Sequence, residues 1–196
     1  MRKICEMLNN HNHPFIISFE GMDRSGKSTQ AKSLYNRLEL ENYNVVLIRS
    51  PSDTDFGKYI KSIKTSLKSP EAVLLIHVAD FFEEQVKYNK DILIYDRYLD
   101  SCFASMLYFG LQKEWINKVV SILPQPNLMI YMFVSLTGIK NRPKLDMGDN
   151  DYAWQRAKEN YYNSIKGRSN VLIVSGEKSI EDIANEVYNE FKKLLV

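Results

Sequence analysis

Phosphate chemistry is indicated by one short segment, Gly21-Met22-Asp23-Arg24-Ser25-Gly26-Lys27-Ser28, which is followed by Thr29. The segment matches the pattern Gly-x-x-x-x-Gly-Lys-Ser/Thr. In such a loop the glycines let consecutive backbone N–H groups turn inward around a phosphate, and the helix that follows adds its positive end. We expect Lys27 to bridge the terminal phosphates of a nucleotide and the Ser28 hydroxyl to hold Mg²⁺. The alternative is a plain strand-to-helix turn with a solvated lysine.

A second segment points to the same metal. Residues 92–95 form a short apolar run that ends at Asp96, and Arg97 comes next. An acid at the end of a neighbouring buried strand is the expected second partner of Mg²⁺ beside this kind of loop. An aspartate in this position also commonly caps a helix, so the assignment of Asp96 to the metal depends on the phosphate-binding segment.

The elements that must position these residues follow from apolar patterning. Short apolar runs predict five buried strands at residues 15–19, 44–49, 92–95, 128–134 and 171–174. Helical spacing begins at Lys27, and further helices are expected from Ser69-Pro70 to about Tyr88 and from Ser179 to Leu195. Because strands alternate with helices, we expect an α/β fold with a parallel sheet covered on both faces.

We expect one domain over residues 14–196 after a flexible N-terminal tail over residues 1–13. The one polar, irregular stretch inside the domain lies at about residues 140–151 and contains Arg142. A stretch this polar cannot belong to the core, so it is either a plain surface loop or a mobile lid.

Bulk composition restricts the function classes. The 196 residues carry 26 Lys and Arg against 24 Asp and Glu, and the formal net charge of +2 excludes the strong field of a general nucleic-acid binder. No apolar run approaches the roughly 20 residues that span a membrane. Two cysteines, Cys5 and Cys102, cannot build a disulfide framework. We therefore expect a cytoplasmic enzyme without nucleic-acid or membrane partners.

Taken together, these residues resemble thymidylate kinases, the P-loop nucleoside monophosphate kinases that phosphorylate dTMP with ATP. Similar segments occur in family order at Phe19–Gln30, Arg49–Pro51, Asp96–Tyr98, Leu123–Leu128 and Lys178–Asp182. The resemblance implies a P-loop kinase fold of about five parallel strands, with ATP and Mg²⁺ as cofactors. It also implies a nucleoside monophosphate as substrate and a homodimer as the assembly.

The resemblance implies a role for each matching residue. Loop residues Gly21, Asp23, Arg24, Ser25, Gly26, Lys27, Ser28 and Thr29 would hold ATP. Arg49 and Arg97 would clamp the phosphate of the acceptor, and Asp23 would also contact its 3′-hydroxyl. Either Arg24 or Arg142 would neutralise charge on the transferring phosphoryl group. We favour Arg24, because the motif fixes its position.

The predicted helix over residues 70–88 departs from the family pattern. Thymidylate kinases carry a Phe that stacks on thymine and, four residues later, an Arg that binds its edge, whereas the aligned positions here are Ile76 and Asp80. Thymine offers two carbonyl acceptors and one N–H donor, and an ionised carboxylate only accepts. Asp80 would instead suit a base with amino or imino donors, such as cytosine, adenine or guanine. The alternative is a shifted helix, with Asp80 merely exposed and Phe81 or Phe82 against the base.

Two other functions stay open at this point. A deoxynucleoside kinase needs a general base near a neutral hydroxyl, usually a carboxylate at the end of the second strand, but Arg49 stands there. A nucleotide-dependent switch ATPase needs a residue that orients the attacking water, and no Gln or Glu is obviously placed for this. Arg49 together with Arg97 favours an acceptor that already carries a phosphate.

Overall fold

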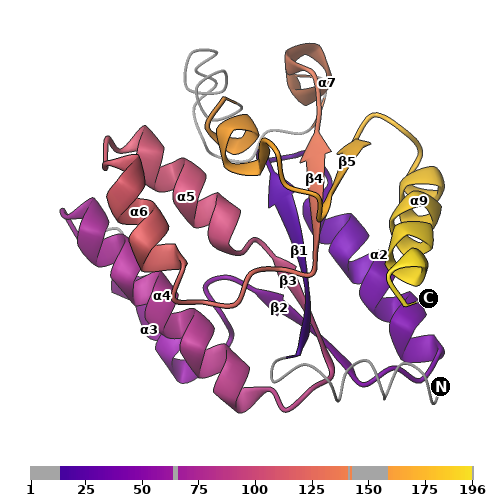
Figure 1. Ribbon diagram of the computed structural model, residues 1–196, viewed down its shortest axis with the longest axis horizontal. Helices are drawn as coiled ribbons and strands as arrows, with labels where there is room; N and C mark the ends of the chain where they lie inside the picture. Colours follow the sequence, from indigo (N-terminus) through magenta and orange to yellow (C-terminus); the bar gives the residue numbers. More distant parts are fainter. Residues whose placement is uncertain (1–13, 64–65, 141, 143–158, 196) are drawn as a thin grey trace.

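The computed structural model describes residues 14–63, 66–140, 142 and 159–195. Its centre is a sheet of five parallel strands in the order β2-β3-β1-β4-β5 (Figure 1). The strands are β1 Phe15–Gly21, β2 Val45–Arg49, β3 Ile92–Asp96, β4 Leu128–Phe133 and β5 Val171–Ser175. This confirms the predicted α/β fold, and each strand lies within two residues of its expected bounds.

Helices cover both faces of the sheet. One face carries α2 Lys27–Leu40 and α9 Ile180–Lys193; the other carries α3 Asp55–Ile63, α4 Pro70–Lys87, α5 Leu99–Tyr108 and α6 Lys113–Val120 (Figure 1). Alternate residues of β1 divide between the two layers, with Ile17 in the core under α2 and α9 and Ile16 in the core under α4, α5 and α6. A short helix, α7 Leu136–Lys140, follows β4, and residues 159–165 form another helix before β5.

Two helices begin at a serine whose side chain caps the first turn. Ser69 caps α4 by accepting a hydrogen bond from the Ala72 N–H, and Ser179 caps α9 in the same way through the Asp182 N–H. Helix α3 was not expected from the sequence. Its nine residues bury only Gly57 and Ile60, so the apolar stripe is too short to show a helical period.

Three expectations concern features that the structure does not test. The N-terminal tail and most of the polar stretch 140–151 lie outside the described residues, apart from the backbone of Lys140 and from Arg142. Among the helices in the described part of the chain, none is long and apolar enough to cross a membrane. The cytoplasmic location stays a prediction.

Candidate active site

The loop between β1 and α2 carries the phosphate-binding segment in the strand–loop–helix context that the pattern requires. Gly21 and Gly26 adopt φ angles of 131° and 101°, and Arg24 adopts 64°. A Cβ atom at Gly21 would lie 2.2 Å from the carbonyl oxygen of Met132 in β4, so only glycine fits this position. Gly26 is the N-cap of α2, which places the positive end of the helix at the loop.

Lys27 is buried inside this loop, at 4% exposure. Its Nζ donates hydrogen bonds to the Met22 carbonyl oxygen and to Ser25 Oγ, the latter at 3.3 Å. Burial, together with the nearby Arg97 guanidinium, lowers the pKa of Lys27 to about 7. Among the described residues, no carboxylate is in direct contact with the Lys27 ammonium at the centre of the loop. An anion bound there would therefore stabilise the charged form of Lys27.

The register of the sheet brings the metal and acceptor residues together. Phe19 in β1 pairs with Asp96 in β3, and Asp96 pairs with Arg49 in β2. The side chains of Asp96 and Arg49 therefore meet at the carboxyl ends of the strands. Asp96 Oδ2 accepts a hydrogen bond from Ser28 Oγ at 2.6 Å and lies 3.9 Å from Arg49 Nε. The arginine side chain is 76% exposed, whereas the aspartate side chain is 7% exposed.

The Ser28 hydroxyl and the Asp96 carboxylate fit a magnesium ion. Both are hard oxygen donors in direct contact beside the phosphate-binding loop. Mg²⁺ is usually held by one or two such groups, with substrate phosphates and water completing its shell. No cluster of three or more metal-binding side chains occurs in the part of the chain that the structure describes. The protein therefore supplies only part of a coordination shell, which suits a metal that arrives with a nucleotide.

Arg97 is held in place by acceptors from several elements. Its Nη1 donates to the Gly21 carbonyl oxygen at 3.3 Å, to Ser101 Oγ at 3.3 Å and to Tyr161 OH at 3.2 Å. Its Nη2 forms an ion pair with Asp23 Oδ1. The backbone of Arg97 lies in the left-handed region, at φ 76°, and its N–H donates to the Phe19 carbonyl oxygen at 3.1 Å. The guanidinium is therefore oriented before any ligand binds.

Glu20 is a site residue that the sequence reasoning missed. It is fully buried in β1 and accepts hydrogen bonds from the Tyr98 N–H at 2.8 Å and from Ser101 Oγ. Burial, helped by the Asp100 charge, raises the pKa of Glu20 to about 7. Glu20 thus anchors the first turn of α5, which follows Arg97. The one local signal was an acid inside a mostly apolar strand, which does not by itself give the role of Glu20.

The two candidate transition-state arginines are neighbours. Arg24 Nη1 donates to the Arg142 carbonyl oxygen at 3.4 Å, and Arg142 Nη1 donates back to the Arg24 carbonyl oxygen. Arg142 Nη2 also donates to the carbonyl oxygen of Gly176, in the loop between β5 and α9. Both arginines therefore lie at the rim of the phosphate-binding loop, and the choice between them stays open.

A cavity of about 350 Å³ opens beside Arg49. Its lining consists of Arg49, Ser50, Pro51, Asp53 and Lys61, with Lys61 Nζ 2.8 Å from Asp53 Oδ1. Helix α4 approaches the same loop through His77, whose Nδ1 lies 3.4 Å from Ser50 Oγ. The cavity lies at the carboxyl end of β2, where a parallel α/β sheet usually binds its ligands.

The structure does not support the expectation that Asp80 meets a base. Asp80 is fully buried, and its carboxylate accepts hydrogen bonds from Ser52 N–H at 2.8 Å and from Ser52 Oγ at 2.7 Å. Thr54 Oγ1 donates to the same carboxylate at 3.5 Å. Asp80 therefore anchors the loop after Pro51 to helix α4. Ile76 is half-buried one turn earlier, and its contact with a base stays a prediction.

A model of the thymidylate kinase family matches residues 19–187. The chain is 32% identical to a probable thymidylate kinase of Sulfolobus acidocaldarius over 186 residues, covering 89% of this chain and 95% of the relative. It is 34% identical to a probable thymidylate kinase of Pyrococcus horikoshii over 191 residues, covering 88% and 93%. The thymidylate kinase of Ehrlichia chaffeensis shares the fold, with a TM-score of 0.74 at 24% identity over 91% of this chain and 99% of that one. The chain therefore belongs to the thymidylate kinase family of ATP-dependent nucleoside monophosphate kinases.

Proposed function

We propose that this enzyme transfers the γ-phosphoryl group of ATP to dTMP in a site that uses Mg²⁺. The observation that carries the proposal is the position of two arginines beside the loop that buries Lys27: Arg49 contacts Asp96, and Arg97 donates to the Gly21 carbonyl oxygen of the loop itself. Cationic groups at the loop and at the ends of the neighbouring strands can hold a donor and an acceptor that are both phosphates.

The protein would act by position and charge, without a covalent intermediate. Loop N–H groups and Lys27 would hold the phosphates of ATP, while Ser28 and Asp96 would hold the magnesium ion. When bound, the metal adds positive charge to the phosphate oxygens. Arg97, already oriented by its protein partners, would bind the acceptor phosphate together with Arg49. Arg24 or Arg142 would neutralise charge that develops on the transferring group.

A monophosphate acceptor explains the end of β2 better than a nucleoside does. A neutral hydroxyl needs a base to remove its proton, but β2 ends in Arg49, whose nearest acid is the Asp96 assigned to the metal. A phosphate monoester carries a charge of about −1.5 to −2 at pH 7 and needs cationic partners instead. In the part of the chain that the structure describes, β2 therefore does not end in the carboxylate that a deoxynucleoside kinase needs, and the nearby Asp53 is paired with Lys61.

The case for a base other than thymine rested on Asp80. Because that carboxylate is committed to Ser52 and Thr54, it gives no reason to prefer a base rich in amino donors. Thymine is then the base that family membership supports, and dTDP is the expected product.

The acceptor is tested by steady-state assays with dTMP, dCMP, dAMP and dGMP, each with ATP and Mg²⁺. We expect kcat/KM for dTMP to exceed the others by about tenfold or more. Lys27→Ala serves as the inactive control, and Lys32→Ala, an exposed lysine on the same helix, serves as its matched control. A preference for another base would refute dTMP as the acceptor. ATP consumption that is indifferent to the acceptor would favour a switch ATPase.

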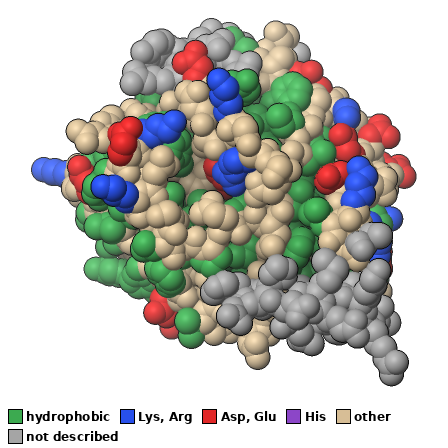
Figure 2. Space-filling model, in the orientation of Figure 1, with side chains coloured by type: hydrophobic (Ala, Val, Ile, Leu, Met, Phe, Trp, Pro, Cys, Tyr) green, Lys and Arg blue, Asp and Glu red, His purple; other side chains and the backbone are tan. Residues whose placement is uncertain are grey.

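We also propose a homodimer that pairs through α4. Leu75, Phe82 and Val86 lie on one face of this helix and are 50%, 41% and 84% exposed, and Tyr59 of α3 is 58% exposed. Hydrophobic side chains gather along the edge of the molecule where α3 and α4 lie (Figure 2). Contiguous apolar surface of this kind is typical of protein interfaces.

Sedimentation would test the dimer. The expected mass is twice the 22.9 kDa of the chain, and Val86→Glu should shift it to the monomer. Leu40→Glu is the matched control, because Leu40 on α2 is also 84% exposed but lies on the other face of the sheet. A wild-type monomer, or a dimer that survives Val86→Glu, would contradict this interface.

A further inference from the structure

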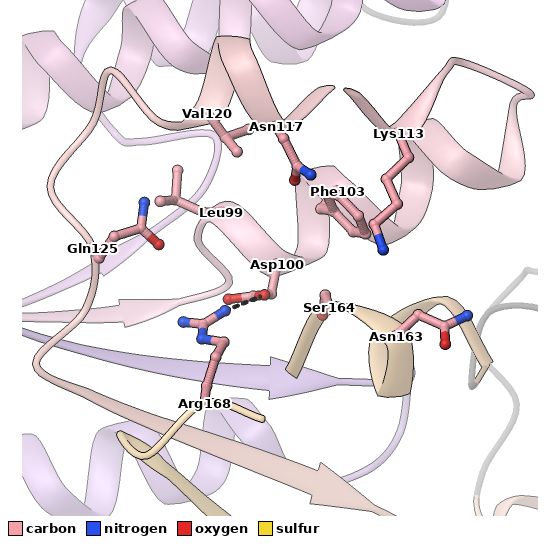
Figure 3. A pocket seen from close by; sticks show the side chains of 10 residues that line it. All are labelled: Leu99, Asp100, Phe103, Lys113, Asn117, Val120, Gln125, Asn163, Ser164 and Arg168. Atoms are coloured by element: carbon pink, nitrogen blue, oxygen red, sulfur yellow. Dashed lines mark hydrogen bonds and ion pairs between the residues drawn. The ribbon is translucent and has the colours of Figure 1, made fainter. Parts of the chain in front are cut away.

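A second cavity, of about 240 Å³, lies between α5, α6 and the helix at residues 159–165 (Figure 3). It opens on a different face of α5 from the active site. Leu99, Asp100 and Phe103 line the cavity, whereas Ser101 between them bonds to Arg97 and Tyr161. None of the residues that line it has a role in the proposed phosphoryl transfer.

The cavity combines an apolar floor with polar groups around its opening. Leu99, Phe103 and Val120 supply the apolar surface, and Lys113, Asn117 and Asn163 supply amine and amide groups (Figure 3). Lys113, Asn117 and Asn163 are exposed, so their side chains are free to rearrange around a ligand. An apolar pocket with a few convergent polar groups is the usual form of a small-molecule site.

Arg168 lies in the wall of the cavity and adds positive charge there. Its Nη1 donates to Asp100 Oδ1 at 2.7 Å, and Asp100 is nearly buried. Its Nη2 is buried and has no hydrogen-bond partner within the described part of the chain. Because Nη2 is buried, Arg168 acts on the cavity through its charge and not through this donor. The charged groups that line the cavity are Lys113, Arg168 and Asp100, so the lining carries a net positive charge.

We propose that this cavity is a second ligand site, for a small molecule that joins one oxyanion group to an apolar ring. The oxyanion, a phosphate or a carboxylate, would accept from Lys113 Nζ in the positive field of Lys113 and Arg168. The ring would lie against Phe103 and Val120. The free amides of Asn117 and Asn163 would bind polar substituents at the opening.

The position of the cavity ties it to the active site. Asp100 faces the cavity, and its neighbour Ser101 accepts from Arg97 and lies 2.9 Å from Tyr161 OH. On the 159–165 helix, Ser164 lines the cavity and Tyr161 contacts Arg97. Two elements therefore have one side at the cavity and the other at the acceptor clamp, so a ligand here would bind behind the groups that orient Arg97.

The test follows backbone amides by proton–nitrogen NMR while phenyl phosphate, benzoate or benzyl alcohol is added to the full chain. We expect phenyl phosphate, benzoate or both to shift the amides of Asn117 and Ser164, and the neutral alcohol to shift neither. A response to one anion alone identifies the phosphate or the carboxylate as the group recognised. This readout is independent of kinase activity, so it does not depend on the proposed function.

Variants on α6 make the test specific. Lys113→Glu should weaken the binding of the active probe by about tenfold or more, because it reverses a charge at the opening. Lys118→Glu is the matched control, since Lys118 is exposed on the same helix and does not line the cavity; it should change binding by less than about twofold. Asn117→Trp should fill the opening and abolish binding without disturbing the buried Asp100–Arg168 pair.

Three results would overturn the proposal. The first is the absence of shifts at Asn117 and Ser164 with either anion up to about 10 mM. The second is a set of shifts confined to the phosphate-binding loop, which would place the probe in the active site. The third is equal weakening by Lys113→Glu and Lys118→Glu, which would indicate attraction to surface charge in general.

Discussion

The donor side and the acceptor side of the active site are built in different ways. On the donor side, a contiguous loop presents backbone N–H groups and buries a cation, Lys27, with a pKa lowered to about 7 by burial. On the acceptor side, Arg49 ends β2 and Arg97 directly follows β3, and the acids Asp80 and Glu84 are buried in α4. One of these acids is Glu84, whose pKa burial and the Asp80 charge raise to about 9.

This difference decides what each side can do. Backbone geometry fixes the donor side, so the loop recognises phosphate and little else. Side chains build the acceptor side, and they differ in freedom: Arg97 bonds to four protein groups, whereas Arg49 is 76% exposed. We infer that Arg97 provides a fixed contact and that Arg49 closes on the acceptor once it binds.

The largest effect should come from the two arginines. Arg97→Ala removes an oriented guanidinium and leaves Asp23 and Ser101 without their Arg97 partner. We therefore expect kcat/KM for dTMP to fall by about 10³-fold. Arg49→Ala removes an exposed side chain whose ion pair in the described part of the chain is the 3.9 Å contact with Asp96, and we expect kcat/KM to fall by about 10- to 10²-fold, mainly through KM. Steady-state kinetics with dTMP as the varied substrate measures both. Equal losses would show that the two arginines do not differ in pre-organisation.

The buried acid Glu84 should make stability depend on pH. In the folded protein it keeps its proton up to a pKa of about 9, whereas in the unfolded chain it ionises near the ordinary glutamate pKa of 4.5. Its contribution to stability is therefore complete below about pH 4.5 and is lost as the pH rises towards 9. Relative to the wild type, the unfolding free energy of Glu84→Gln in urea should rise by about 4 kcal/mol between pH 5 and pH 8.

Glu83→Gln is the control for this measurement, since Glu83 is exposed on the same helix. A stability difference between Glu84→Gln and the wild type that stays constant from pH 5 to pH 8 would show that Glu84 does not titrate in this range.

A smaller effect on activity is expected when the loop after Pro51 loses a hydrogen bond to Asp80. Asp80→Asn replaces one of two accepting oxygens with an amide that cannot accept from Ser52. The KM for dTMP should rise by about tenfold with little change in kcat, and unfolding free energy should fall by about 1–3 kcal/mol. An unchanged KM beside lower stability would leave Asp80 without influence on the acceptor site.

The smallest expected effect is the uptake of a proton when ATP binds. Because Lys27 is largely neutral at pH 8 and a bound phosphate favours its charged form, ATP binding should take up as much as about 0.9 proton at pH 8 and less at pH 6. Calorimetry in buffers of different ionisation enthalpy measures this uptake. Lys27→Arg should abolish it, because arginine stays charged. Uptake that persists in that variant would assign the proton to another group.

The same contrast explains how far the sequence could predict this molecule. The strands and the phosphate-binding loop follow from contiguous residues, so apolar runs and the glycine–lysine pattern located them within two residues. Asp96 was also predictable, because it ends a buried strand beside that loop. The meeting of Asp96 with Arg49 depends on sheet register, which the sequence alone does not give.

Asp80 and Glu20 were beyond reach for a physical reason. The helical spacing of α4 places Asp80 on a face with Ile76, but the partner of that face is the loop after Pro51, more than twenty residues earlier. Glu20 is buried because Tyr98 and Ser101, about eighty residues later, satisfy its oxygens. In both cases the role of an acid is set by tertiary contacts that no local pattern encodes.

The central claim is that the acceptor is a nucleotide that already carries a phosphate. Phosphorus NMR of a reaction with ATP, Mg²⁺ and equal concentrations of dTMP and thymidine tests it most directly. Binding of the acceptor phosphate by Arg49 and Arg97 predicts that dTDP forms and that thymidine is consumed at least about a hundredfold more slowly. The formation of dTMP from thymidine at a comparable rate would contradict the account.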